Sequence, residues 1–217
     1  MHKTFVVVFA IAATLAGIRP ASAQATVPER GLFVTLRVGL EAVQQVGGLA
    51  ELQFGQHLTP RTDFFGELTL LQDVVTRARV ESAEAVATYL TPIQGQTVTA
   101  TLEMPAFAAT VGIRHFLSEP AMLRPYIVGQ IGVARTTLQP TFLAGETDIT
   151  ENMEQYGVVL GSDLAGSNLA PVFGGGIGVT SGFNDWYFDA SLRIMSVRVG
   201  SQSANVKVLA VGIGRRF

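Results

Sequence analysis

The first candidates for chemistry in this sequence are His115 and Ser118, because an imidazole can take the proton of a nearby hydroxyl and make it a nucleophile. They stand three positions apart, and an odd spacing along a strand sends two side chains to opposite faces. We find no arrangement that supplies a nucleophile, a base and an orienting acid together. The pair therefore indicates residues of an interface or a turn, and we expect the protein not to be an enzyme.

Two other stretches could be taken for ligand sites. The glycine-rich run from Phe173 to Gly178 continues into Val179 and Thr180, whereas a phosphate-binding loop leads into the first turn of a helix. Glycine in a strand more often marks a bend or a close backbone approach. A set of acidic residues also lacks the spacing of a calcium loop: Glu146, Asp148, Glu151, Glu154 and Asp163. We therefore expect no cofactor and no metal.

A third set of candidates is charged and balanced in sign. It contains three cationic and three anionic residues: Arg37, Glu51, Glu67, Arg114, Asp189 and Arg193. These side chains could form an ionic network if the elements that carry them turn all six toward one interior. Whether they do so depends on the architecture of the chain.

The composition favours a membrane protein built from strands. Hydrophobic residues make up 48% of the chain, charged residues only 15%, and the mean hydropathy is +0.36, where a soluble domain usually has about a quarter of its residues charged. Past the N-terminal segment, the longest charge-free stretches are interrupted by polar residues, Gly and Pro. Because a backbone in lipid must satisfy its own hydrogen bonds, a closed β-barrel is the other spanning solution.

Other classes of protein are excluded by charge and by residue type. The net charge is −2 and no cluster of Lys and Arg is present, so the sequence gives no reason to expect nucleic-acid binding. The absence of cysteine excludes a disulfide framework, a thiolate metal site and a cysteine nucleophile.

Period-two alternation predicts the strands of the barrel. From Leu32 to Ala42 one face is apolar while the other carries Thr35, Arg37 and Glu41, and Asn184 to Val199 alternates in the same way. Further strands are expected at 48–57, 63–73, 104–117, 126–136, 169–180 and 205–217. Short connections rich in Pro or Gly alternate with longer ones, of which 74–103 and 138–168 are the longest. We predict an all-β fold, an eight-stranded antiparallel up-and-down transmembrane β-barrel.

The N-terminal segment has the features of a cleaved signal peptide. Lys3 precedes an apolar run from Phe5 to Gly17, and the small residues Ala21 and Ala23 form an A-x-A cleavage site. The alternative, a single membrane anchor, needs about 20 predominantly apolar residues. We expect residues 1–23 to be removed and residues 24–217 to form one barrel domain. Gln24 stands where a lipoprotein would have cysteine, so we expect no N-terminal lipid.

The end of the chain resembles the last strand of outer-membrane β-barrels, in which apolar residues alternate before a terminal aromatic one: Leu209, Val211, Ile213 and Phe217. Arg215 stands where that family usually has an apolar residue or tyrosine. The stretch from Arg124 to Gly129, together with Val111 to Phe116 before it, is similar to the fourth and fifth strands of small OmpA-like barrels.

This resemblance implies a location in the cell outer membrane, in contact with lipid and lipopolysaccharide. It also implies recognition of the C-terminal strand by the barrel-insertion machinery, and we expect a monomer. The family serves structural or surface-interaction roles through external loops. Alternatives are a narrow porin or carrier for small hydrophobic compounds and, less favoured, an enzyme acting on lipid A.

In such a barrel the interior is just wide enough for side chains to fill it. The six charged residues are expected to point inward and to pair, because an unpaired buried ion costs several kcal/mol. We expect them to plug the middle of the barrel, with Arg114 nearer the periplasmic end. A static ionic core is favoured over a gate whose ion pairs rearrange.

Aromatic residues are expected to collect at one rim of the barrel, where rings prefer the membrane interface. This predicted periplasmic girdle contains Phe33, Phe64, Phe116, Tyr126, Trp186 and Phe217.

Overall fold

The computed structural model describes residues 31–118, 122–161, 164–199 and 202–217. The predicted cleavage site at Ala21 and Ala23 lies outside these residues. Eight long strands form the barrel: β1 (Leu32–Ala42), β2 (Val46–Thr59), β3 (Thr62–Leu71), β5 (Ala106–Phe116), β6 (Leu123–Ala144), β8 (Gly166–Phe183), β9 (Trp186–Val199) and β10 (Gln202–Arg216).

Each of these strands pairs antiparallel with its neighbours along the chain, and β1 pairs with β10, so the ring has no free edge. The eight-stranded antiparallel barrel predicted from the sequence is therefore confirmed. Alternation explains the ring, since successive residues of β1 are alternately exposed and buried from Leu32 to Arg37.

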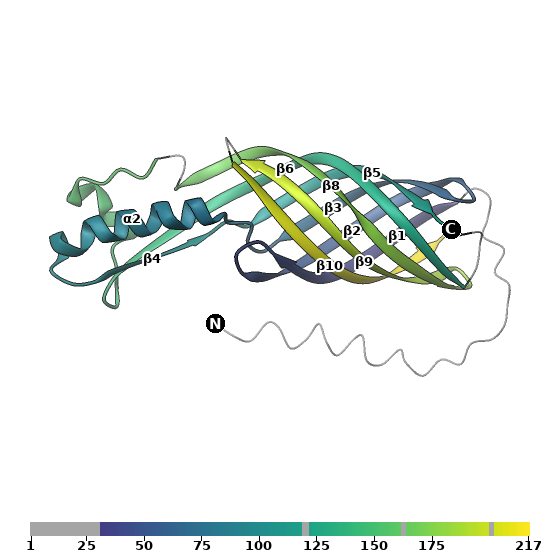
Figure 1. Cartoon of the computed structure of the whole chain (residues 1–217), viewed down its shortest axis with the longest axis horizontal. Helices are drawn as coiled ribbons and strands as arrows, with labels where there is room; N and C mark the ends of the chain where they lie inside the picture. Colours follow the sequence, from purple (N-terminus) through teal and green to yellow (C-terminus); the bar gives the residue numbers. More distant parts are fainter. Residues whose placement is uncertain (1–30, 119–121, 162–163, 200–201) are drawn as a thin grey trace.

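The two ends of the barrel differ (Figure 1). The short-turn end carries the start of β1, the end of β10 and the connections 60–61, 117–122 and 184–185. The long-loop end carries the connections 72–105 and 145–165. Among the residues that the structure describes, elements project well past the barrel only at the long-loop end.

The long connections, expected only as loops, are folded. They contain the helix α2 (Arg77–Gln94), the strands β4 (Val98–Glu103) and β7 (Thr147–Asp148), and the 3-10 helix η1 (Thr150–Tyr156). Strand β6 continues beyond the barrel wall to Ala144 and pairs there with both β4 and β7. We call α2, β4, β7, η1 and residues 139–144 of β6 the outer lobe.

Helix α2 packs on β4 through small and apolar residues on one face, namely Ala83, Ala87 and Leu90. It ends at Gly95, whose φ of 66° is the left-handed conformation that glycine adopts without strain. No helix among the described residues is long and apolar enough to cross a membrane.

One apolar core links the barrel to the outer lobe. Inside the barrel, toward the long-loop end, most inward positions are apolar, including Ala108, Val172 and Val208. Glu41, Thr69 and Thr136 are buried polar exceptions. The same cluster continues through Val74 and Met104 into the lobe, where it contains these residues: Leu90, Val98, Leu102, Phe142, Ala144, Ile149 and Met153. The lobe and the barrel therefore share a core.

The outward face of the barrel is also apolar. Exposed large residues occur on every strand of the ring, among them Leu36, Leu52, Leu70, Phe107, Ile131, Ile177, Leu192 and Leu209. A continuous apolar exterior of this kind suits contact with lipid chains. The barrel thus buries charged side chains in its interior and exposes large apolar ones on its outer face. A soluble domain has the opposite arrangement.

Candidate functional site

The middle of the barrel holds a ring of alternating charges. Arg37 Nε donates to Glu51 at 2.7 Å, and its Nη2 contacts Glu67. Arg193 Nη1 donates to Glu67 at 2.8 Å, and its Nη2 contacts Glu51. Two arginines and two glutamates thus alternate in a closed cycle. The arginine side chains are 2% exposed and the carboxylates are fully buried.

The strand registers bring these residues together. Arg37 on β1 lies directly opposite Glu51 on β2. On its other side Arg37 faces Gly212 of β10, and Gly212 in turn faces Asp189 of β9. Because Gly212 has no side chain, Arg37 reaches across β10, and its Nη1 lies 3.3 Å from Asp189 Oδ1.

Asp189 joins this ring to a second group nearer the short-turn end. Arg114 donates to Asp63 Oδ2 through Nε at 2.9 Å and Nη2 at 2.7 Å, and its Nη1 lies 3.3 Å from Asp189. The hydroxyl of Tyr126 donates to Asp189 at 3.0 Å. His57 Nδ1 bonds the other oxygen of Asp63. We call the connected set the interior charge cluster: Arg37, Arg114, Arg193, Glu51, Glu67, Asp63 and Asp189.

The structure places all six charged residues chosen from the sequence on the inward face, and all six belong to this cluster. Arg114 lies nearest the short-turn end, opposite Asp63 in the register. Sequence reasoning missed Asp63 and His57. The signal for Asp63 was its position two residues before Phe65 and four before Glu67, which gives all three the same face of β3.

The predicted aromatic girdle is wrong for three of its six residues. Phe33, Phe116 and Tyr126 are each 1% exposed and point into the barrel, where their rings surround the Arg114 guanidinium at 4.9, 5.3 and 5.2 Å. Alternation is the reason, because Phe33 shares its face with Thr35 and Arg37. With Phe65 and Tyr187, these rings form an interior aromatic layer.

The other three girdle residues, Phe64, Trp186 and Phe217, are exposed on the outside of the short-turn end. The departure noted at Arg215 also has a structural explanation. Its guanidinium lies 5.6 Å from the ring centre of Trp186 and 5.2 Å from that of Phe217. This outward group combines aromatic rings with a cation, as membrane interfaces favour.

The glycine-rich run of β8 makes room for interior side chains. A Cβ at Gly176 would collide with Arg193, and one at Gly178 would collide with Tyr126. Gly174 lies against Gln130 and Met195 in the same way. The close approach expected from the sequence therefore accounts for these glycines.

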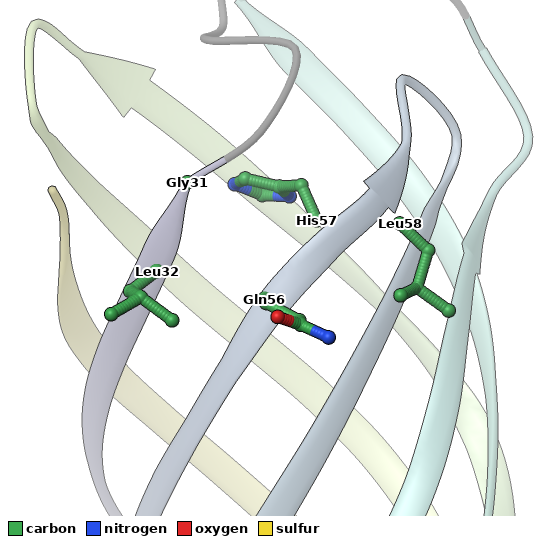
Figure 2. Close-up of a pocket in the computed structure, with 5 residues that line it drawn as sticks. All are labelled: Gly31, Leu32, Gln56, His57 and Leu58. Carbon is green, nitrogen blue, oxygen red and sulfur yellow. The ribbon is translucent and has the colours of Figure 1, made fainter.

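The remaining candidates from the sequence lie apart from the interior charge cluster. His115 faces outward and bonds the Thr62 hydroxyl at 3.2 Å. The residues that the structure describes contain no group of three or more His, Asp or Glu side chains that could hold a metal ion. A hollow of about 400 Å³ lies at the short-turn end beside Leu32, Gln56 and Leu58 (Figure 2). His57, which also lines it, has its Nδ1 bonded to Asp63.

Comparisons with known proteins agree with the fold. No family model and no curated protein sequence matches the chain. The crystal structure of Neisserial surface protein A has a TM-score of 0.53 and 10% identity, over 88% of this chain and 98% of that one.

Two other similar structures have lower scores. The N-terminal β-barrel domain of OprF from Pseudomonas aeruginosa has a TM-score of 0.48 and 14% identity, over 86% of this chain and 97% of that one. The attachment invasion locus protein Ail of Yersinia pestis has a TM-score of 0.44 and 12% identity, over 87% and 97%. At such identities the likeness concerns the fold alone.

Proposed function

We propose that this chain is an exported, integral outer-membrane protein of the small OmpA-like kind, whose closed barrel anchors the outer lobe for contacts at the cell surface. The observation that carries the proposal is the single apolar core that runs from the barrel interior into the lobe. Because they share this core, the barrel holds the lobe in a fixed orientation. Its role is structural and interactive, not catalytic.

We infer the orientation of the barrel in the membrane from the side chains and the connection lengths at its two ends. The outward group of Trp186, Arg215 and Phe217 suits the periplasmic interface. Outer-membrane barrels have short periplasmic turns and longer external loops. The short-turn end then faces the periplasm and the outer lobe faces the surroundings of the cell.

The packing of the barrel interior favours a role as an anchor and argues against a role as a pore. The interior charge cluster fills its middle, and the inward residues beyond it are fully covered, among them Val172, Met195, Val197 and Val206 at 0% exposure. An ion crossing the barrel would have to leave its water to pass this section, which is largely apolar apart from Glu41, and that is costly. We therefore favour the anchor over the narrow porin or carrier.

Lipopolysaccharide is the partner we propose for the outside of the long-loop end. Three exposed basic residues face outward there, Arg135 on β6, Arg198 on β9 and Lys207 on β10. Cationic side chains just beyond an apolar belt suit anionic phosphates. Insertion through the C-terminal strand and a monomeric state complete the proposal.

The orientation is tested by labelling, for which the absence of native cysteine is an advantage. Glu151→Cys in the outer lobe should react with a membrane-impermeant maleimide in intact cells. Asp185→Cys, in the turn between β8 and β9, is the matched control and should react only after the outer membrane is permeabilised. Labelling of Asp185→Cys alone in intact cells would reverse the orientation and contradict the proposal.

The closed state is tested by planar-bilayer recording of the purified barrel. We expect no unitary conductance steps at neutral pH. Stable steps would contradict the anchor and favour the narrow porin.

A further inference from the structure

Five arginines are buried inside the barrel, but only three of them have carboxylate partners. Arg37, Arg114 and Arg193 each contact two or three carboxylates of the interior charge cluster. The other two, Arg124 on β6 and Arg216 on β10, form no ion pair with a described residue, although they are only 2% and 7% exposed. An unpaired buried cation is costly, so these two require an explanation.

Both residues lie on the short-turn side of the interior aromatic layer. The Arg124 guanidinium is 3.8 Å from the ring centre of Phe116, and the Arg216 guanidinium is 4.7 Å from that of Tyr187. The aromatic rings separate them from the carboxylates in the middle of the barrel. Stacking on a ring satisfies a guanidinium face but leaves its N–H donors free to bind acceptors in the ring plane.

Several donors of this pair are buried without an acceptor. Arg124 Nη2 donates to Pro60 O at 2.6 Å, but its Nε and Nη1 have no partner. Arg216 Nε also has none. Thr180, directly opposite Arg124 in the register, carries a buried hydroxyl without a partner. Buried donors in proteins are nearly always satisfied, so an unmatched group of them points to a ligand or to ordered water.

The two arginines approach the same part of the mouth. Arg216 extends from β10 to Gly182 of β8, since a Cβ built on Gly182 would lie 3.2 Å from Arg216 Nη1. Gly182 N bonds Met122 O at 3.2 Å, just before Arg124. Arg124 and Arg216 are near enough to repel each other.

Within the described part of the chain, the acidic groups near the pair are Asp63 and Asp185. Asp63 is committed to Arg114 and His57. Asp185 belongs to the exposed turn between β8 and β9. Neither forms an ion pair with Arg124 or Arg216, so no described carboxylate neutralises the two guanidinium groups.

We propose that Arg124, Arg216 and Thr180 form an anion site at the short-turn mouth of the barrel, which takes a phosphate group. A tetrahedral oxyanion presents several acceptors to converging N–H and O–H donors, and its charge cancels the repulsion between the two guanidinium groups. The phosphate is either free or the head of a lipid in the adjoining leaflet.

The first experiment uses inorganic phosphate and the full mature chain in a phosphate-free maltoside detergent. Phosphate is titrated against chloride at constant ionic strength, and binding is followed by calorimetry and by the thermal unfolding midpoint. We expect phosphate to raise the midpoint of the native sequence. Arg216→Gln should weaken phosphate binding by at least about tenfold, since it removes a charge-assisted interaction.

Arg215→Gln is the matched control, because Arg215 is the adjacent residue but faces outward. It should bind phosphate as the native sequence does. Arg216→Lys keeps the charge but loses the planar donors, and we expect intermediate affinity; it replaces Arg216→Gln if that variant fails to fold.

The second experiment separates the two sources of phosphate. The protein is placed in phosphatidylethanolamine and phosphatidylglycerol vesicles and observed by phosphorus NMR. A bound lipid resonance that Arg216→Gln lacks identifies a headgroup, whereas a persisting effect of free phosphate identifies the free ion. The site is refuted if the native sequence shows neither a phosphate-specific shift nor a bound lipid resonance. It is also refuted if Arg216→Gln responds like the native sequence.

Discussion

Replacing Arg37 by methionine tests whether the interior charge cluster stabilises the barrel as the contacts suggest. Arg37 bonds Glu51 at 2.7 Å, contacts Glu67 and lies 3.3 Å from Asp189. Methionine fills much of the same space without charge. Three buried carboxylates would each lose one cationic neighbour.

The expected loss in the free energy of unfolding depends on the partners that the three carboxylates keep. Removing one partner of a buried ion pair costs about 3–5 kcal/mol. Here Arg193 still binds both glutamates, while Arg114 and Tyr126 still bind Asp189. We therefore expect the lower end of that range, a loss of about 3 kcal/mol in the free energy of unfolding.

The assay is urea unfolding in lipid vesicles, followed through the fluorescence of Trp186, the only tryptophan in the chain. The control is Arg135→Met, which removes an exposed outward-facing arginine and should change the free energy by less than about 0.5 kcal/mol. A loss below about 1 kcal/mol for Arg37→Met, on the scale of an exposed ion pair, would refute the reasoning.

A double-mutant cycle makes the test specific to the pair. The double variant Glu51→Gln with Arg37→Met should lose clearly less free energy of unfolding than the sum of the two single variants. Each single variant leaves a buried group without its partner, whereas the double variant removes both groups. Strict additivity would show that the two residues are not coupled. Arg37→Met should also remain closed in planar-bilayer recordings, since the apolar section beyond the cluster is unchanged.

Two further pairs of variants probe packing, each by the urea midpoint of the folded barrel. Gly178→Val places a side chain against the Tyr126 ring and should destabilise the barrel by about 1–3 kcal/mol or prevent folding. The control Gly175→Val adds its side chain on the outward face and should be tolerated. Equal effects of the two variants would contradict the interior packing of β8. Leu90→Ala removes a fully buried side chain from the core of the outer lobe and should cost about 2–5 kcal/mol. Its neighbour Tyr89 is 57% exposed, and Tyr89→Ala should change little; a separate early transition in Leu90→Ala would mean that the lobe unfolds independently of the barrel.

The sequence determined the strands and their two faces because alternation is local: each residue's face depends on its neighbours two positions away. This rule placed Arg37, Glu51 and Arg193 inside. Applied to Phe33, which is two residues before Thr35, the same rule gives an interior position. The girdle prediction failed there because the preference of aromatic rings for the membrane interface was set above the alternation.

Other features were decided only in three dimensions. Arg37 meets Asp189, 152 residues away, because Gly212 leaves an open path between them, and that depends on two strand registers. The outer lobe gave no clear local signal, since the buried face of α2 is made largely of small residues, Ala83 and Ala87. Helix α2 is held by packing on β4 and on the end of β6, and most helical stability in proteins comes from such tertiary contacts. A pattern along one segment cannot contain those contacts, because they exist only once distant segments have paired.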